Sequence, residues 1–202
     1  ADAQYTLGLR FETGRGVRQD DQQAVKWYQK AAEQQHQRAI AALGYMYEKG
    51  YGVSMDERKA FDFYQQSLPA QVPRALTALG LFYKNGRQVK ANDKKAVELF
   101  TLAADQGYAN AQYNLGWMYE YGRGVSKDLV KARDLYQQAA EQNEALALWL
   151  EQGLEAMINS GELLSHMQQH GLTGHVFPLK AHNTKRWLEL PNPRLSPGTD
   201  PT

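Results

Sequence analysis

The chain has 202 residues, of which 43% are apolar and 22% are charged, and its formal net charge is +1. This balance is typical of a folded globular protein and excludes a disordered chain. The near-zero charge excludes a global basic field that would attract nucleic acid or acidic membranes. No apolar run reaches the ~18 residues that a membrane-spanning helix needs. Cysteine is absent, which excludes disulfides and thiolate metal sites.

A 36-residue repeat organises the first 142 residues. A Leu-Gly pair marks each copy: Leu7-Gly8, Leu43-Gly44, Leu79-Gly80 and Leu115-Gly116. The same step separates a turn glycine (Gly14, Gly50, Gly86, Gly122), an alanine (Ala24, Ala60, Ala96, Ala132) and an aromatic residue (Tyr28, Tyr64, Phe100, Tyr136). These columns predict four repeats, at 1–36, 37–72, 73–108 and 109–142, in an array of one supersecondary unit per repeat.

Each repeat is predicted to be a helix-turn-helix unit. In the first copy a helix is expected over about 3–12, because Ala3, Leu7 and Phe11 are spaced by four on one face. Gly14 follows where a helix end favours a left-handed residue. A short polar residue that can cap free backbone donors precedes each second helix: Asp20, Asp56, Asn92 and Asp128. One such hairpin cannot bury its own apolar face, so the units are expected to stack into a curved solenoid.

The repeat resembles a known family. The run Ala-Gln-Tyr-Asn-Leu-Gly-Trp-Met-Tyr at 111–119, followed by Gly-Arg-Gly-Val at 122–125 and Ala-Ala at 139–140, is similar to the Sel-one-like repeat (SLR) family, a branch of the tetratricopeptide-type helical repeats. The resemblance covers residues 1 to about 142. It implies an all-α fold, a right-handed α–α superhelix of four 36-residue repeats.

The second and third repeats depart locally from this pattern. Ser67-Leu68 replaces the Ala-Ala pair, and Gln88 replaces the second turn glycine. Pro69 and Pro73 are expected to end the second helix of the second repeat early.

The last 60 residues do not follow the repeat. Residues 143–170 are rich in helix formers and are predicted to be a helical cap over the apolar face of the last repeat. Residues 171–202 contain several prolines and are predicted to form an extended tail. Residue 1 already lies inside a helical pattern, so we expect that the natural N-terminus, with any targeting segment, has been trimmed.

Features that invite a catalytic or metal-binding interpretation have simpler explanations. The Gly-x-Gly runs lack the strand, glycine and lysine of a phosphate loop and recur at every helix turn, so they are interpreted as turns. His166 and His170 are spaced by four, but no carboxylate accompanies them in a metal-binding motif. We therefore predict no catalytic residue, metal or cofactor, and no enzyme. A hydrolase that uses His166 and His170 is the least favoured alternative.

The resemblance to tetratricopeptide-type repeats implies that the first helix of each repeat lines a concave binding face. The residues that it places there are Tyr5, Leu9, Tyr45, Glu48, Leu81, Lys84, Tyr113, Trp117, Glu120 and Tyr121. The richest aromatic cluster is Tyr113, Trp117 and Tyr121, and such residues dominate interface energetics. The alternative is that this aromatic stripe is part of the core.

The function expected from this resemblance is that of a non-enzymatic scaffold or adaptor, which binds a protein or peptide in its groove. A narrower alternative is a bacterial immunity protein that neutralises a secreted toxic effector, for example a phospholipase. The family implies a bacterial envelope or periplasmic location, with the cytoplasm as the alternative. We expect a monomer that binds no nucleic acid and has no membrane-spanning segment.

Overall fold

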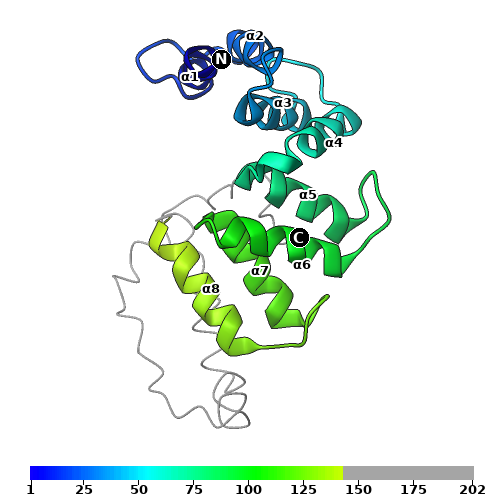
Figure 1. The fold of residues 1–202 in the computed structure, drawn as a ribbon. Coiled ribbons are helices and arrows are strands. Elements are labelled where there is room, and N and C mark those ends of the chain that lie inside the picture. Colours follow the sequence, from blue (N-terminus) through cyan, green and yellow to red (C-terminus); the bar gives the residue numbers. More distant parts are fainter. Residues whose placement is uncertain (143–202) are drawn as a thin grey trace, which may run out of the picture. The chain divides into compact units, whose positions relative to one another are not determined.

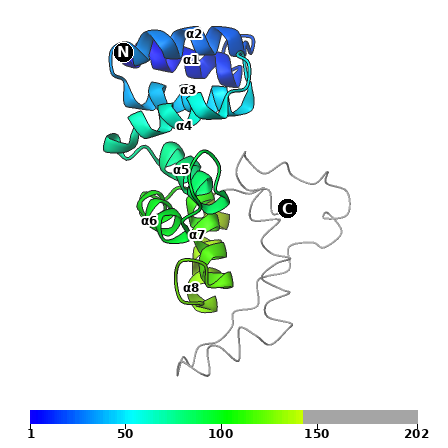
Figure 2. The ribbon, with the colours of Figure 1, turned by 90° about the vertical axis from the view of Figure 1, so that its right-hand side faces the viewer.

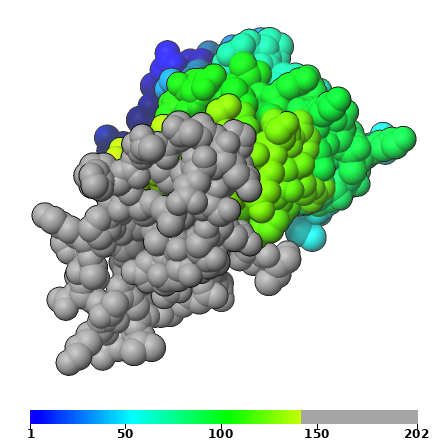
Figure 3. All heavy atoms as spheres, turned by 90° about the horizontal axis from the view of Figure 1, so that it is seen from below, coloured from blue at the N-terminus to red at the C-terminus, as the bar shows by residue number. Residues whose placement is uncertain are grey.

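The computed structural model describes residues 1–142, drawn in colour in Figure 3. This part of the chain consists of α-helices and one short 3-10 helix, η1 (Figure 1). Their bounds are α1 Asp2–Thr13, α2 Asp21–Ala32, α3 Gln37–Lys49, α4 Glu57–Gln66, η1 Leu68–Ala70, α5 Pro73–Asn85, α6 Asp93–Ala104, α7 Ala109–Tyr121 and α8 Leu129–Gln142. The predicted all-α fold of four helix-turn-helix repeats is confirmed. The predicted cap at 143–170 and tail at 171–202 lie outside the described residues.

The chain divides into two compact units after Ala103. Unit 1 holds α1 to α5 and α6 up to Ala103, which are the helices of the first three repeats, and unit 2 contains α7 and α8 of the fourth. In unit 1, α1 packs against α2 and α3 packs against α4, each as a pair of neighbours (Figure 2). Helix α2 also packs on α3, and α4 on α5, so successive repeats share an apolar interface.

Close contact between a glycine and an aromatic ring joins the two helices of each repeat. A Cβ atom added at Gly44 would stand 2.7 Å from the ring of Tyr64, and one at Gly116 would stand 2.8 Å from Tyr136. Gly8 meets Tyr28 and Gly80 meets Phe100 in the same way. Because no larger residue leaves room for the ring, this packing explains why glycine follows leucine in every copy.

The residues that end each first helix and those that cap each second helix are the ones that the sequence predicts. The turn glycines at 14, 50, 86 and 122 have φ angles between 65° and 69°, and each N–H donates to the carbonyl four residues earlier. Asp56 accepts a bond from the Lys59 backbone N–H at 2.9 Å, and Asp20, Asn92 and Asp128 cap their helices in the same way. The Gly-x-Gly runs are therefore helix turns, as predicted.

The second repeat ends early, as its prolines predict. Helix α4 has 10 residues, compared with 12 in α2. The hydroxyl of the buried Ser67 donates to the Tyr64 carbonyl at 2.9 Å, and η1 then carries the chain to Pro73 at the start of α5. In the next turn, Gln88 adopts φ 58°, the left-handed conformation of the glycine that it replaces.

Candidate binding face

The first helices of unit 1 bring a set of polar and aromatic side chains together. Arg74 on α5 contacts both Tyr45 on α3 and Glu12 on α1. We call the set Tyr5, Glu12, Tyr45, Glu48 and Arg74 the first-helix face. Tyr5, Tyr45 and Glu48 are among the residues predicted to line the binding face.

The glutamates of this face bind tyrosines of the second helices. The Tyr64 hydroxyl donates to Oε2 of Glu48 at 2.8 Å, and the Tyr28 hydroxyl donates to Oε2 of Glu12. In unit 2, Tyr136 donates to Glu120 at 2.6 Å. Glu48 and Glu120, which are both predicted to line the binding face, thus also join the two helices of their own repeats.

Burial keeps these tyrosine hydroxyls protonated, so that they can serve as donors. Tyr64 is fully buried, and burial raises its pKa well above the usual value, with a further increase from the negative charge of Glu48. The pKa of Tyr28 and that of Tyr136 are raised for the same reasons, burial first. Each pair is therefore a charge-assisted hydrogen bond that is shielded from water.

The third repeat changes both members of the pair. Phe100 takes the tyrosine position and offers no hydroxyl, while Lys84 takes the glutamate position. Phe100 still packs against Gly80 and remains buried. The joint change avoids burying a carboxylate beside a ring that cannot donate to it.

Arg74 spans the face from the third repeat to the first. Its Nη1 lies 3.5 Å from Oε1 of Glu12, and its guanidinium carbon lies 4.6 Å from the centre of the Tyr45 ring. Tyr51 packs edge-on against Tyr45 with ring centres 5.8 Å apart. Arg74 of the third repeat therefore contacts a residue of the first, so the first-helix face extends over three repeats of unit 1.

The Tyr45 ring forms the centre of this cluster. It is half-buried, and burial, followed by the neighbouring Tyr51, raises its pKa to about 12. Tyr51 is 42% exposed and Arg74 is 37% exposed. Aromatic and guanidinium groups that are held in place but still reach solvent are the side chains best suited to contact a partner.

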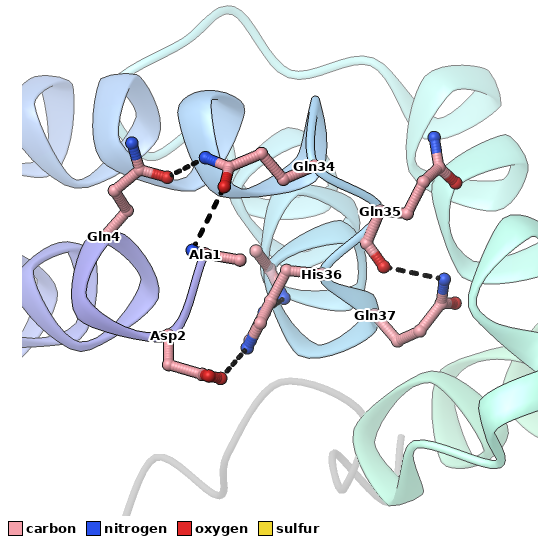
Figure 4. A network of polar contacts seen from close by, with 8 residues as sticks. Ala1, Asp2, Gln4, Gln34, Gln35, His36 and Gln37 are labelled. Atoms are coloured by element: carbon pink, nitrogen blue, oxygen red, sulfur yellow. Dashed lines mark hydrogen bonds and ion pairs between the residues drawn. The ribbon is translucent and has the colours of Figure 1, made fainter.

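A polar network fixes the end of the face where the first two repeats join (Figure 4). Nδ1 of His36 accepts a bond from the Ala39 N–H at 3.1 Å and so caps α3, while Nε2 lies 3.1 Å from a carboxylate oxygen of Asp2. Because Nδ1 accepts, the proton is on Nε2 and is donated to Asp2. The imidazole also stacks on Tyr5 with ring centres 4.8 Å apart, which holds that ring in place.

The remaining predicted residues lie in different environments. Leu9 and Lys84 are half-buried, and Leu81 is buried. In unit 2, the predicted cluster is divided: Tyr113 is buried against Tyr136 with ring centres 5.6 Å apart, and belongs to the packing between α7 and α8. The expectation that Leu81 and Tyr113 form an accessible surface is corrected here, since both side chains are used in packing.

The other two aromatic residues of that cluster pair with each other. Trp117 and Tyr121 have ring centres 4.8 Å apart, and Tyr121 is 59% exposed. The guanidinium of Arg123 lies 5.4 Å from the Trp117 ring. Arg123 stands directly after a turn glycine, and Tyr51 stands at the same position of the second repeat. Each contacts the aromatic residue that follows the Leu-Gly pair of its repeat, which is Trp117 for Arg123 and Tyr45 for Tyr51.

Sequence reasoning missed two residues of the unit 1 cluster, Arg74 and Tyr51. Tyr51 stands between the two turn glycines, a position interpreted only as part of a turn. Arg74 stands at a position filled by Asp2, Arg38 and Asn110 in the other repeats. Arginine fills that position in only two of the four repeats, so the repeat pattern alone could not indicate its role.

The described residues show neither a metal-binding cluster nor a membrane-spanning helix. Within residues 1–142, no group of three or more histidine, aspartate or glutamate side chains is placed to hold a metal ion. His166 and His170 lie outside the described residues. Among the helices described, none has the length and apolar character needed to cross a bilayer.

Stacked two-helix units joined by glycine turns define a helical-repeat protein. The sequence matches the family model of the Sel1 repeat at residues 1–36, 37–68, 73–108 and 109–144, so the chain belongs to the Sel1 repeat family. No curated protein matches the chain.

Solved structures with the same fold include a protective antigen of uropathogenic Escherichia coli and a Sel1 repeat protein of Oxalobacter formigenes. The first is 37% identical, with a TM-score of 0.67, over 79% of this chain and 34% of that chain. The second is 30% identical, with a TM-score of 0.64, over 75% of this chain and 62% of that chain. This chain thus spans about a third of the first protein and less than two thirds of the second.

An immunity protein of Pseudomonas aeruginosa is also similar, at 26% identity over 73% of this chain and 67% of that chain. Its TM-score is 0.44, so this likeness supports no inference about function.

Proposed function

We propose that the chain is a non-enzymatic scaffold that holds a segment of a protein partner on the first-helix face of unit 1. Sel1 repeats typically mediate protein binding. The observation that supports this face is the cluster of Tyr45, Tyr51 and Arg74, which combines exposure with fixed positions.

The chemistry of the cluster fits a binding role. Tyrosine and arginine are enriched among residues that contribute most to interface affinity, because each combines a large apolar contact area with polar donors. Tyr45 is held between Tyr51 and Arg74 before any partner arrives. Binding a partner therefore costs less free energy than it would if these side chains were flexible, because they are already ordered.

Affinity capture from a lysate of the native organism tests this proposal. The intact chain is compared with Tyr45→Ala and with a control, Tyr47→Ala. Tyr47 is also half-buried on α3, but it stacks on Phe63 of α4 with ring centres 5.5 Å apart. We expect the intact chain and the control to enrich the same partner, and Tyr45→Ala to lose it by about 10-fold or more.

The control separates binding from folding. Both variants should keep their helical circular dichroism, and their thermal stabilities should be compared before capture. Equal capture by the intact chain and Tyr45→Ala would place the binding surface elsewhere, with Trp117 and Tyr121 as the next residues to change. A secreted effector as the captured partner would identify the scaffold as an immunity protein.

A further inference from the structure

We propose that His36 is a proton-sensitive bridge between α1 and α3, in which the neutral imidazole joins the two helices and the imidazolium contacts α1 alone. This inference goes beyond the proposed function, because it concerns how the first two repeats respond to pH and needs no partner. It is supported by the two ring nitrogens, which contact different helices, and by the absence of a side-chain cap at the matching residues before α5 and α7.

The neutral ring contacts both helices (Figure 4). Nδ1 of His36 accepts the backbone N–H of Ala39 on α3 at 3.1 Å, and Nε2 donates to the Asp2 carboxylate on α1 at 3.1 Å. The ring also stacks on Tyr5 of α1, with ring centres 4.8 Å apart. The His36 side chain is 13% exposed, so these contacts fix its position and join the two helices through one ring.

This cap is specific to the second repeat. The residues at the same position before α5 and α7 are Val72 and Tyr108, and neither side chain caps its helix. The Ala39 N–H also donates to the His36 carbonyl at 3.0 Å, so the first turn of α3 has a backbone bond that does not depend on the ring. Loss of the ring contact should therefore loosen the start of α3 without unfolding the helix.

Proton uptake removes the contact with α3. Histidine is the side chain that gains a proton between about pH 8 and about pH 5. A proton taken from solvent can add only to the lone pair of Nδ1, because Nε2 already carries one. Nδ1 then becomes a donor that faces another donor, the Ala39 N–H, so the cap is lost. The positive charge is also unfavourable at the N-terminus of a helix.

The contacts with α1 favour the charged ring. Among the described residues, the titratable groups in contact with it are the Asp2 carboxylate, which attracts the imidazolium, and the Tyr5 ring, whose face attracts a cation. The Ala1 amino group is bound to a glutamine side chain, and the charged neighbours along the chain, Glu33 and Arg38, are exposed. The Asp2 side chain is 98% exposed, so its attraction is weak. Protonation therefore changes which helix the ring contacts more than it changes the overall stability.

NMR of the ¹⁵N-labelled full chain between about pH 8 and about pH 5 tests the inference. The imidazole nitrogens of His36 report the proton, and hydrogen exchange at the Ala39 amide reports the cap. Lys59 is the internal control, because Asp56 caps its amide at the same position of α4 and carboxylates keep their charge over this range. After correction for the intrinsic rate at each pH, we expect exchange at Ala39 to accelerate by about 5-fold as the ring gains its proton, and exchange at Lys59 to change by less than about 2-fold.

Two further observations separate the proton from the cap. Asparagine caps a helix but has no ionisable proton, so His36→Asn should keep the slow Ala39 exchange of the intact chain at about pH 8 and lose its dependence on pH. In the intact chain, the nuclear Overhauser effect between the His36 and Tyr5 rings should persist when the imidazole is charged, because the ring stays on α1.

Four results would overturn the inference. They are an imidazole that stays neutral at about pH 5, equal changes at Ala39 and Lys59, pH-dependent exchange at Ala39 that persists in His36→Asn, or loss of the Tyr5 contact when the ring is charged. No partner takes part in these measurements, so any of these results would leave the proposed scaffold function unaffected.

Discussion

Replacing Tyr64 with phenylalanine tests whether the tyrosine–glutamate pairs hold the two helices of a repeat together. The Tyr64 ring is fully buried, and its hydroxyl donates to Glu48 at 2.8 Å. A hydrogen bond to a charged group contributes about 1.5–3 kcal/mol. Glu48 keeps two cationic neighbours, Lys49 and Arg87, after the change, so we expect a loss at the lower end, about 1.5 kcal/mol.

Removing the acceptor of this hydrogen bond should cost more stability than removing its donor. Glu48→Ala leaves the Tyr64 hydroxyl buried without its acceptor, and an unsatisfied buried polar group costs about 1–3 kcal/mol in addition to the lost bond. The third repeat indicates how the loss can be reduced, because it carries phenylalanine and lysine at these two positions. We therefore expect the double variant Tyr64→Phe, Glu48→Lys to be less destabilised than the sum of the single variants, by at least about 1 kcal/mol.

Urea unfolding of the full chain, followed by circular dichroism, measures these free energies. Tyr47→Phe is the matched control, because it removes a hydroxyl from a half-buried tyrosine and should change stability by less than about 0.5 kcal/mol. If the two single losses at Tyr64 and Glu48 simply add in the double variant, the pair is not energetically coupled and the reasoning is refuted.

Two further predictions concern protonation. Burial raises the pKa of Tyr28, Tyr45, Tyr64, Tyr113 and Tyr136, so folding favours their protonated form. Their contribution to the free energy of unfolding should therefore be constant below about pH 10 and fall above it, by up to about 1.4 kcal/mol per pH unit for each group. Their absorbance as tyrosinate should appear together with the loss of helix. Their full ionisation by about pH 11 with intact circular dichroism would contradict this. For His36, ¹⁵N NMR should show the proton on Nε2, and His36→Ala should cost about 1 kcal/mol of stability by removing the α3 cap, whereas His36→Asn should retain most of it; equal losses would rule out the capping role.

The fold followed from the sequence because the repeat places the same physical requirement at the same position in every copy. A glycine where two helices touch, a glycine at each turn and a short polar cap are each required locally, so periodicity identified them. The early end of α4 was also predictable, because Pro69 and Pro73 act on the backbone within a few residues.

The binding face was only partly predictable, because its contacts join different helices. The tyrosine–glutamate pairs left a signal that was not used: both members change together in the third repeat, where Phe100 and Lys84 stand. Arg74 left no such signal. Its contact with Glu12 joins the third repeat to the first, and one copy of the pattern does not specify how three repeats stack.

Hydrogen exchange of the captured complex tests the central claim most directly, since it locates the partner on the chain without any substitution. The peptides to compare are those of α1, α3 and α5, which carry the first-helix face, and those of α2 and α4, which do not. We predict that the partner slows exchange most in the segment Gln37–Lys49, around Tyr45, and at the start of α5, around Arg74. Slowed exchange confined to α2 and α4, with these segments unchanged, would contradict the account.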